Sequence, residues 1–135
     1  MTSTNYQELQ SKSTEHWENL TNGPVPLIRI GSAMCGHASG AFRISDEIKK
    51  SIKDKSLNVN LNHVGCLGLC YAEPIVEVKK EGKPRVFFRN VSTEDVDEII
   101  NSYIIGDHIP DIGILGILGD EDPNILATNM IQVNI

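Results

Sequence analysis

The sequence predicts one α/β domain whose strands and helices follow the order β-α-β-β-β-α. Three features predict it: a strictly alternating segment, two amphipathic segments of helical period, and a turn between two short apolar runs. With 135 residues, 40% of them hydrophobic, the chain can bury a core without disulfide bonds. We divide it into an N-terminal helical extension (1–23), the α/β domain (24–106) and an apolar, acidic tail (107–135).

The first half of the chain predicts a helix, a strand and a second helix. Residues 7–20 are polar with a few apolar positions, which indicates a surface helix with Trp17 lying back on the domain. Residues 25–30 form a predicted buried strand. From Ser39 onward, apolar residues recur at helical spacing, so an amphipathic helix is expected to begin just after Cys35.

The second half predicts three strands. Residues 57–64 alternate between apolar and polar side chains, which is typical of a strand with one buried face. This strand leads directly into a Cys-x3-Cys loop. Residues 75–78 and 85–88 are short apolar strands, and the Glu-Gly-Lys-Pro turn at 81–84 joins them as a hairpin.

A second amphipathic helix and the tail follow the hairpin. Ser92 and Asp95 predict a helix cap, and the expected inward positions are Val96, Ile99, Ile100, Tyr103 and Ile104. Beyond Gly106 the chain has apolar clusters, no Lys or Arg, and an alternating end at 132–135. We expect this tail to lie on a partner chain or to begin a further domain, and a disordered tail is the alternative.

The order of elements, with a loop of small residues after the first strand and a proline before the third, is that of the thioredoxin fold. Pro74 stands where thioredoxins keep a cis-proline, and the sequence leaves its isomer open. Adjacent to it, Glu73 could tune the potential of a nearby redox site, but a surface carboxylate is the favoured expectation.

Charge and composition exclude several functions. The formal net charge is −6 and only 5% of residues are aromatic, which argues against binding to nucleic acid. The polar N-terminus does not resemble a signal peptide, and no run is long enough for a membrane span. We therefore expect a cytoplasmic protein, in which clustered cysteines more often bind metal or do redox chemistry than form disulfides.

The predicted fold brings all three cysteines together. Cys35 and the Cys66–Cys70 loop follow two neighbouring strands and should leave the same edge of the sheet. Three glycines, Gly36, Gly65 and Gly68, let the backbone approach a bulky group and direct N–H groups at sulfur. The positive end of the helix opening at Ser39 would favour thiolates.

Two segments carry a more specific resemblance: IRIGSAMCGHASGA at 28–41 and VGCLGLCYAEPIVEV at 64–78. Together they resemble the thioredoxin-like 2Fe-2S ferredoxin domain, in particular the version at the N-terminus of NADH-oxidising flavoprotein subunits of complex I type NADH dehydrogenases and electron-bifurcating hydrogenases. The similarity covers roughly residues 17–106. It implies an electron-transfer domain or subunit that is not catalytic alone and that has a flavin- and NADH-binding partner.

The resemblance also implies a ligand set for a 2Fe-2S cluster. In that family four cysteines hold the cluster; Cys66 and Cys70 match the second pair, and Cys35 matches the later member of the first pair. The earlier member should fall at Ile30, so one ligand is missing. Ser32, His37 or solvent would complete the set, and a histidine ligand would raise the reduction potential.

Two other functions fit the same residues. One is an assembly module of such a complex, either without a cluster or with bound zinc. Zinc could be held by the three cysteines with His37 or His63. His63, however, lies on the buried face of its predicted strand, which indicates a hydrogen-bonded core histidine. A thiol oxidoreductase would use Cys35 as nucleophile. No dinucleotide motif or acid/base pair is present.

Overall fold

The computed structural model describes residues 3–119. Its elements in chain order are α1 (Ser3–Asn22), β1 (Leu27–Gly31), α2 (Met34–Ala38), α3 (Ala41–Asp54), β2 (Asn60–Val64), the 3₁₀ turn η1 (Cys70–Ala72), β3 (Val76–Lys79), β4 (Arg85–Phe88), α4 (Thr93–Ile99), the π-helical turn η2 (Ile100–Ile105) and β5 (Ile114–Leu118). The predicted thioredoxin-like order of strands and helices is confirmed.

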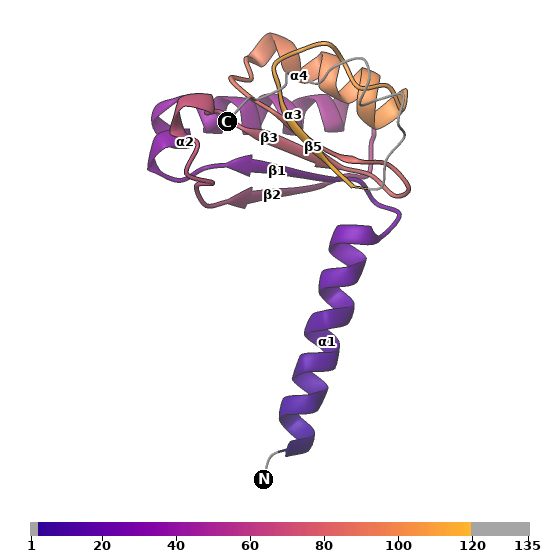
Figure 1. The fold of residues 1–135 in the computed structure, drawn as a ribbon. Coiled ribbons are helices and arrows are strands. Elements are labelled where there is room, and N and C mark those ends of the chain that lie inside the picture. Colours follow the sequence, from indigo (N-terminus) through magenta and orange to yellow (C-terminus); the bar gives the residue numbers. More distant parts are fainter. Residues whose placement is uncertain (1–2, 120–135) are drawn as a thin grey trace.

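The sheet in the described residues has the order β2-β1-β3-β4-β5. β1 and β2 are parallel, and the remaining neighbours are antiparallel. Helices α3 and α4 lie over one face of the sheet, whereas α1 extends away from the domain at the end opposite α2 (Figure 1). The parallel pair matters for function, because the loops that follow β1 and β2 leave the same edge of the sheet.

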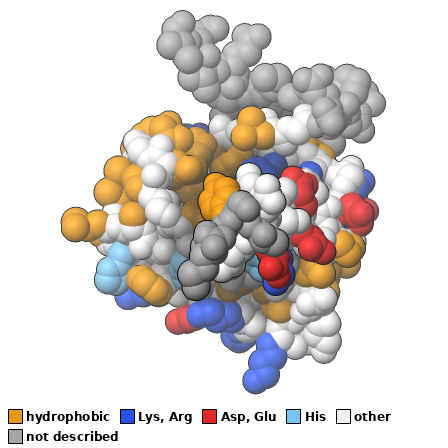
Figure 2. Space-filling model, turned by 90° about the horizontal axis from the view of Figure 1, so that it is seen from below, with side chains coloured by type: hydrophobic (Ala, Val, Ile, Leu, Met, Phe, Trp, Pro, Cys, Tyr) orange, Lys and Arg blue, Asp and Glu red, His pale blue; other side chains and the backbone are white. Residues whose placement is uncertain are grey.

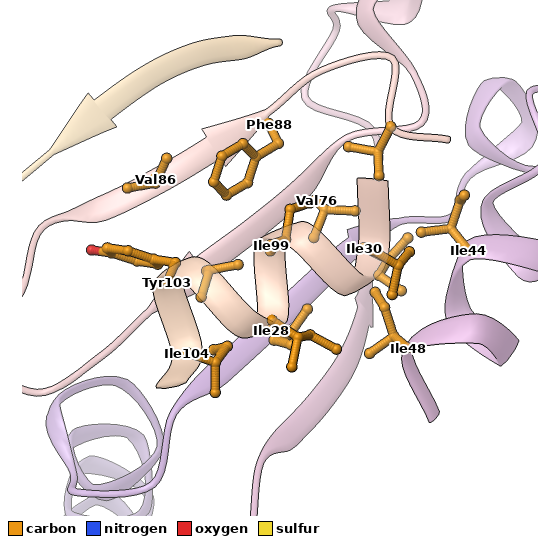
Figure 3. Close-up of a cluster of buried hydrophobic side chains, with 14 of the residues drawn as sticks. Ile28, Ile30, Ile44, Ile48, Val76, Val86, Phe88, Ile99, Tyr103 and Ile104 are labelled. Carbon is orange, nitrogen blue, oxygen red and sulfur yellow. The ribbon is translucent and has the colours of Figure 1, made fainter. Parts of the chain in front are cut away.

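The core lies between the sheet and helices α3 and α4. Ile28 and Ile30 of β1 point towards Ile44 and Ile48 of α3, and the side chains of α4 and η2 close the other side (Figure 3). The five inward positions predicted for the last helix are all buried: Val96, Ile99, Ile100, Tyr103 and Ile104. Helical periodicity therefore identified the core-facing residues correctly.

The predicted cap of α4 is present as a capping box. The Ser92 backbone N–H donates to Asp95 Oδ2 over 2.8 Å, and the Ser92 hydroxyl donates to the same oxygen over 2.7 Å. This arrangement satisfies groups that a helix start would otherwise leave unpaired.

The segment after Gly106 joins the domain in a way that the sequence did not predict. Residues Ile114–Leu118 form β5 and pair antiparallel with β4, and Ile109 is buried on the core. Without β5, β4 would be an edge strand with a row of unpaired backbone groups, and the apolar segment at 114–118 satisfies them. The first part of the expected tail thus lies on this domain's own sheet, while its predicted strand-like end, 132–135, falls outside the described residues.

Helix α1 contacts the domain only near its C-terminal end in Figure 1. Trp17 stays 54% exposed, with the Arg29 guanidinium carbon 5.5 Å from its ring centre. Thr21 is buried, and its hydroxyl donates to the Trp17 carbonyl. No helix among residues 3–119 combines the length and apolar character needed to cross a membrane.

Candidate functional site

The site forms where β1 and β2 end side by side. Gly31 and Val64 are register partners at the last position of each strand, and the Ser32 N–H donates to the Val64 carbonyl over 2.9 Å. Cys35 follows β1, and the Cys66–Cys70 loop follows β2. The two cysteine-bearing segments therefore leave the same edge of the sheet.

Cys66 and Cys70 form a close pair of thiols. Their Sγ atoms lie 3.7 Å apart, and the Gly68 backbone N–H points at Cys66 Sγ from 3.1 Å. Gly68 has φ +83°, a left-handed conformation that a residue with a β-carbon adopts only with strain. The loop thus folds back so that its own amide faces one of its sulfurs.

The third thiol, Cys35, affects this pair electrostatically. The pKa of the Cys70 thiol is raised, chiefly by its interaction with Cys35, while a hydrogen bond with Cys66 opposes the shift. All three cysteines are free, with Cys66 and Cys70 exposed and Cys35 partly buried.

The segment around Cys35 differs from its prediction. Cys35 lies inside the short helix α2, and Gly40, with φ +100°, separates α2 from α3. The amphipathic helix begins at Ala41 and not at Ser39, which instead caps the end of α2. The left-handed residue Gly40 lies between the two helices. The expectation that the amphipathic helix begins just after Cys35 is therefore wrong, because α2 and Gly40 precede it.

The candidates for a fourth ligand occupy different places. Ser32 follows β1 directly, and its hydroxyl donates a long hydrogen bond of 3.4 Å to the Val64 carbonyl, at the start of the second cysteine loop. His37 is exposed on α2, with its ring edge-on to Phe42 at 4.8 Å. Ile30 is fully buried in β1 and lies among the core side chains near Ile44 and Ile48 (Figure 3).

His63 is hydrogen-bonded as predicted, but it is not buried. Its Nε2 lies 3.0 Å from the Ser45 hydroxyl of α3, and its ring stacks on Phe42 at 5.8 Å. The side chain is exposed because β2 is the edge strand and His63 lies near its end. A strand's alternation gives the face of a residue but not how completely that face is covered.

Glu73 is buried, in contrast to the expected surface carboxylate. Its exposure is 6%, and its Oε2 accepts the Ile75 backbone N–H over 2.8 Å. The Glu73–Pro74 bond is cis. The Glu73 carboxylate lies against Gly31 and Gly36, which belong to the other cysteine-bearing segment. Because these neighbours are distant in the chain, the sequence pattern gave no indication that Glu73 is buried.

Exposed apolar side chains surround the thiols. Each cysteine has one such neighbour in the chain: Met34 beside Cys35, Leu67 beside Cys66 and Tyr71 beside Cys70. We call these three residues the apolar rim. In Figure 2, hydrophobic side chains gather next to histidines at the left end of the molecule, the end that carries α2 in Figure 1.

The sulfur spacing suits a shared metal. A tetrahedral metal with bonds of about 2.3 Å to sulfur separates two thiolate ligands by about 3.8 Å, and the Cys66–Cys70 separation is 3.7 Å. No group of three or more Cys, His, Asp or Glu side chains in residues 3–119 is arranged around a single ion.

Solved structures share this architecture. The thioredoxin-like [2Fe-2S] ferredoxin from Aquifex aeolicus superposes with a TM-score of 0.59 over 68% of this chain and 97% of its own, at 19% identity. The fold is that of a thioredoxin-like ferredoxin. A second structure of a thioredoxin-like ferredoxin from the same organism has a TM-score of 0.60 at 18% identity, over 72% of this chain and 94% of its own.

The sequence is similar to those of a ferredoxin and of a hydrogenase subunit. The chain is 44% identical over 52 residues to a 2Fe-2S ferredoxin of Clostridium pasteurianum, an alignment that spans 38% of this chain and 48% of that ferredoxin. It is 26% identical over 103 residues to subunit HndB of an NADP-reducing hydrogenase of Solidesulfovibrio fructosivorans, spanning 74% of this chain and 81% of that subunit. No protein-family model matches the sequence.

Proposed function

We propose that this chain is a one-electron carrier that binds a 2Fe-2S cluster within a multisubunit oxidoreductase. The observation that carries the proposal is the Cys66–Cys70 separation of 3.7 Å, with Cys35 following the parallel neighbour strand at the same edge of the sheet. The relatives support it, because one is named a 2Fe-2S ferredoxin and another a hydrogenase subunit. Such a cluster supplies reversible one-electron oxidation and reduction.

Three cysteines would supply ligands to the two irons. Cys66 and Cys70 would hold one iron, and Cys35 would hold the other together with a fourth group. Ser32 is the better-placed candidate, because its hydroxyl lies at the start of the second cysteine loop, whereas His37 lies on the exposed side of α2 against Phe42. Solvent is the remaining alternative.

Two glycines shape the surroundings of the cysteines. The Gly68 N–H donates to Cys66 Sγ, and hydrogen bonds to the sulfurs are one means of setting a cluster's reduction potential. Gly36 has a packing role, because a β-carbon there would lie 2.2 Å from the Gly31 carbonyl oxygen. Gly36 thus allows α2, and with it Cys35, to lie against the end of β1.

The surface around the thiols fits a partner protein that exchanges electrons with this chain. The apolar rim leaves Met34 86% exposed and Tyr71 71% exposed, values typical of side chains that become covered in a complex. Residues 32–45 and 63–72 contain Arg43 but no Asp or Glu, although the whole chain carries a net charge of −6. This end therefore favours a partner with an apolar, mildly acidic docking surface.

The partner that the sequence resemblance implies is a flavin- and NADH-binding subunit or domain. The HndB relative supports a place in a hydrogenase-type complex. The three free thiols suit a reducing compartment such as the cytoplasm. Electron exchange across the apolar rim requires no covalent chemistry from this chain, so the chain would not turn over a substrate alone.

The alternative functions fit the geometry less well. Mononuclear zinc needs four ligands around one ion, and His37 and His63 instead contact Phe42. A thiol oxidoreductase with Cys35 as nucleophile would leave the Gly68 N–H that points at Cys66 Sγ without a role. Both arguments favour the cluster.

The test is metal analysis and spectroscopy of the full chain purified without oxygen. We expect iron and acid-labile sulfide in the ratio of a 2Fe-2S cluster, a visible charge-transfer spectrum and an EPR signal after one-electron reduction. A colourless protein that takes up no iron on reconstitution would overturn the proposal. Stoichiometric zinc in place of iron would establish the zinc-bound alternative.

A further inference from the structure

A buried carboxylate joins the two halves of the candidate site. Glu73 lies three residues after Cys70, and its oxygens occupy the space beside two glycines that flank Cys35 in the chain. A β-carbon on Gly31 would lie 2.7 Å from Glu73 Oε1 and 2.8 Å from Oε2, and one on Gly36 would lie 3.4 Å from Oε2. The side chain from the second cysteine segment therefore packs directly against the first.

We propose that Glu73 is the positioning residue that holds Cys35 in place relative to Cys66 and Cys70. We also infer that its negative charge lowers the reduction potential of the bound cluster, and this second part rests on the proposed function. Burial of a carboxylate costs free energy unless polar groups compensate it, so an apolar side chain would serve better if filling space were its only role.

Three observations define how the residue acts. The hydrogen bond from the Ile75 N–H to Oε2 anchors the carboxylate to the start of β3. The Gly31 N–H donates to the Ile75 carbonyl over 3.0 Å, which joins the same strand to the end of β1. Glu73 is thus held from β3 while it contacts Gly36, the residue next to Cys35.

The negative charge has an electrostatic consequence. A fixed carboxylate in a poorly solvated place opposes the arrival of an electron nearby, because the interaction between like charges is strong where water is excluded. Burial, net charge and hydrogen bonding are among the properties by which a protein sets the potential of an iron-sulfur cluster. Among 32–45 and 63–74, Glu73 is the one acidic residue.

The positioning role can be tested without a cluster. In a Cys66→Ser background only Cys35 and Cys70 remain as thiols, and the rate at which diamide converts them to a disulfide reports their alignment. Glu73→Ala should slow this reaction by about tenfold, because small misplacements of reacting groups have effects of that size. Glu73→Gln, which keeps the shape and the acceptor for the Ile75 N–H, should react as fast as the parent. An unchanged rate in a folded Glu73→Ala protein would overturn the positioning role.

Two glycine variants keep the test decisive if Glu73→Ala alone does not fold. Gly31→Ala should also slow disulfide formation, because all three nearest atoms to its new methyl group belong to Glu73. Adding Glu73→Ala to Gly31→Ala should restore part of the rate. Gly36→Ala is the matched control, because its methyl group meets the Gly31 backbone at 2.2 Å and the loss of Glu73 should not relieve it. Equal behaviour of the two glycine variants would contradict the proposal.

The charge is tested in the iron-loaded chain. Glu73→Gln should keep the EPR line shape of the wild type while its reduction potential, from an EPR-monitored redox titration, moves to a higher value. An unchanged potential would contradict the electrostatic part. If the wild-type chain itself binds no iron, the proposed function fails, and the disulfide assay still decides whether Glu73 positions Cys35.

Discussion

The Sγ atoms of Cys66 and Cys70 lie 3.7 Å apart, and the interaction with Cys35 raises the pKa of the Cys70 thiol. Cys70 is therefore influenced by cysteines of both segments. A C-x3-C spacing alone does not place a third cysteine there; the parallel pairing of β1 and β2 does.

Cys70→Ala is expected to abolish stable cluster binding. The substitution leaves one iron with a single thiolate from its own loop, because alanine supplies no donor atom. Iron per chain after anaerobic reconstitution measures the effect. Leu67→Gln, an exposed position next to Cys66, is the control and should bind as much iron as the wild type. Wild-type iron content in Cys70→Ala would contradict the ligand assignment.

Ser32→Ala is expected to change the EPR spectrum of the reduced cluster, whereas His37→Ala is not. Ser32 follows β1 and reaches towards the second cysteine loop, and its only side-chain hydrogen bond in the described structure is the long one to Val64. The opposite result, in which only His37→Ala changes the spectrum and lowers the reduction potential, would identify the histidine as the fourth ligand.

Ile30→Cys is expected not to supply the missing ligand, although the family's spacing places a cysteine there. Ile30 points into the core between the sheet and α3, so the new thiol would replace apolar packing and stay away from the loops. Loss of the side-chain volume should lower the free energy of unfolding by about 1–2 kcal/mol. Urea denaturation measures this loss, and an EPR spectrum that differs from that of the wild type would show that the thiol reaches the cluster.

Gly68→Ala is expected to weaken cluster binding, whereas Gly65→Ala is tolerated. A methyl group added at either glycine would meet no other atom within 4 Å, but of the two only Gly68 has a left-handed backbone, with φ +83°. A β-carbon in that conformation costs about 1–2 kcal/mol, and relaxation would turn the N–H away from Cys66 Sγ. Transfer of iron to a chelator over time compares the two variants. Equal loss rates would show that the Gly68 backbone is not important to the site.

Tyr103→Phe is expected to lower the free energy of unfolding at neutral pH. It should also make that free energy fall less at alkaline pH than it does in the wild type. The buried Tyr103 hydroxyl donates to the Pro84 carbonyl. Burial, with the negative charge of Asp107 adding to it, raises the pKa of Tyr103 to about 12. Because this folded-state pKa lies above the unfolded value of about 10, the contribution is fully present below pH about 10 and is lost as the pH rises towards about 12.

Chemical denaturation at pH 7 and at alkaline pH measures this effect. At pH 7 the free energy of unfolding of the variant should be about 1 kcal/mol below that of the wild type, the usual size of one buried hydrogen bond. Between the two pH values it should fall by less than that of the wild type. Tyr71→Phe is the matched control, because Tyr71 is exposed. Identical pH dependence in the wild type and Tyr103→Phe would contradict the prediction.

The sequence by itself determined the parts of this protein that depend on local periodicity. Alternation located β2, helical spacing identified Ile99, Tyr103 and their buried neighbours, and the Ser92–Asp95 pair marked the start of α4. It also determined that the cysteine segments meet, because loops after neighbouring parallel strands leave one edge of the sheet.

Only the tertiary structure decided the features that depend on partners distant in the chain. The pairing of β5 with β4 satisfies backbone groups that no local pattern reveals. Glu73 is buried because Gly31 and Gly36 leave space for its carboxylate, and Ile30 is kept from the site by the face of β1 on which it lies. Periodicity assigns a side chain to a face, but what covers that face is decided by segments that meet only when the chain folds.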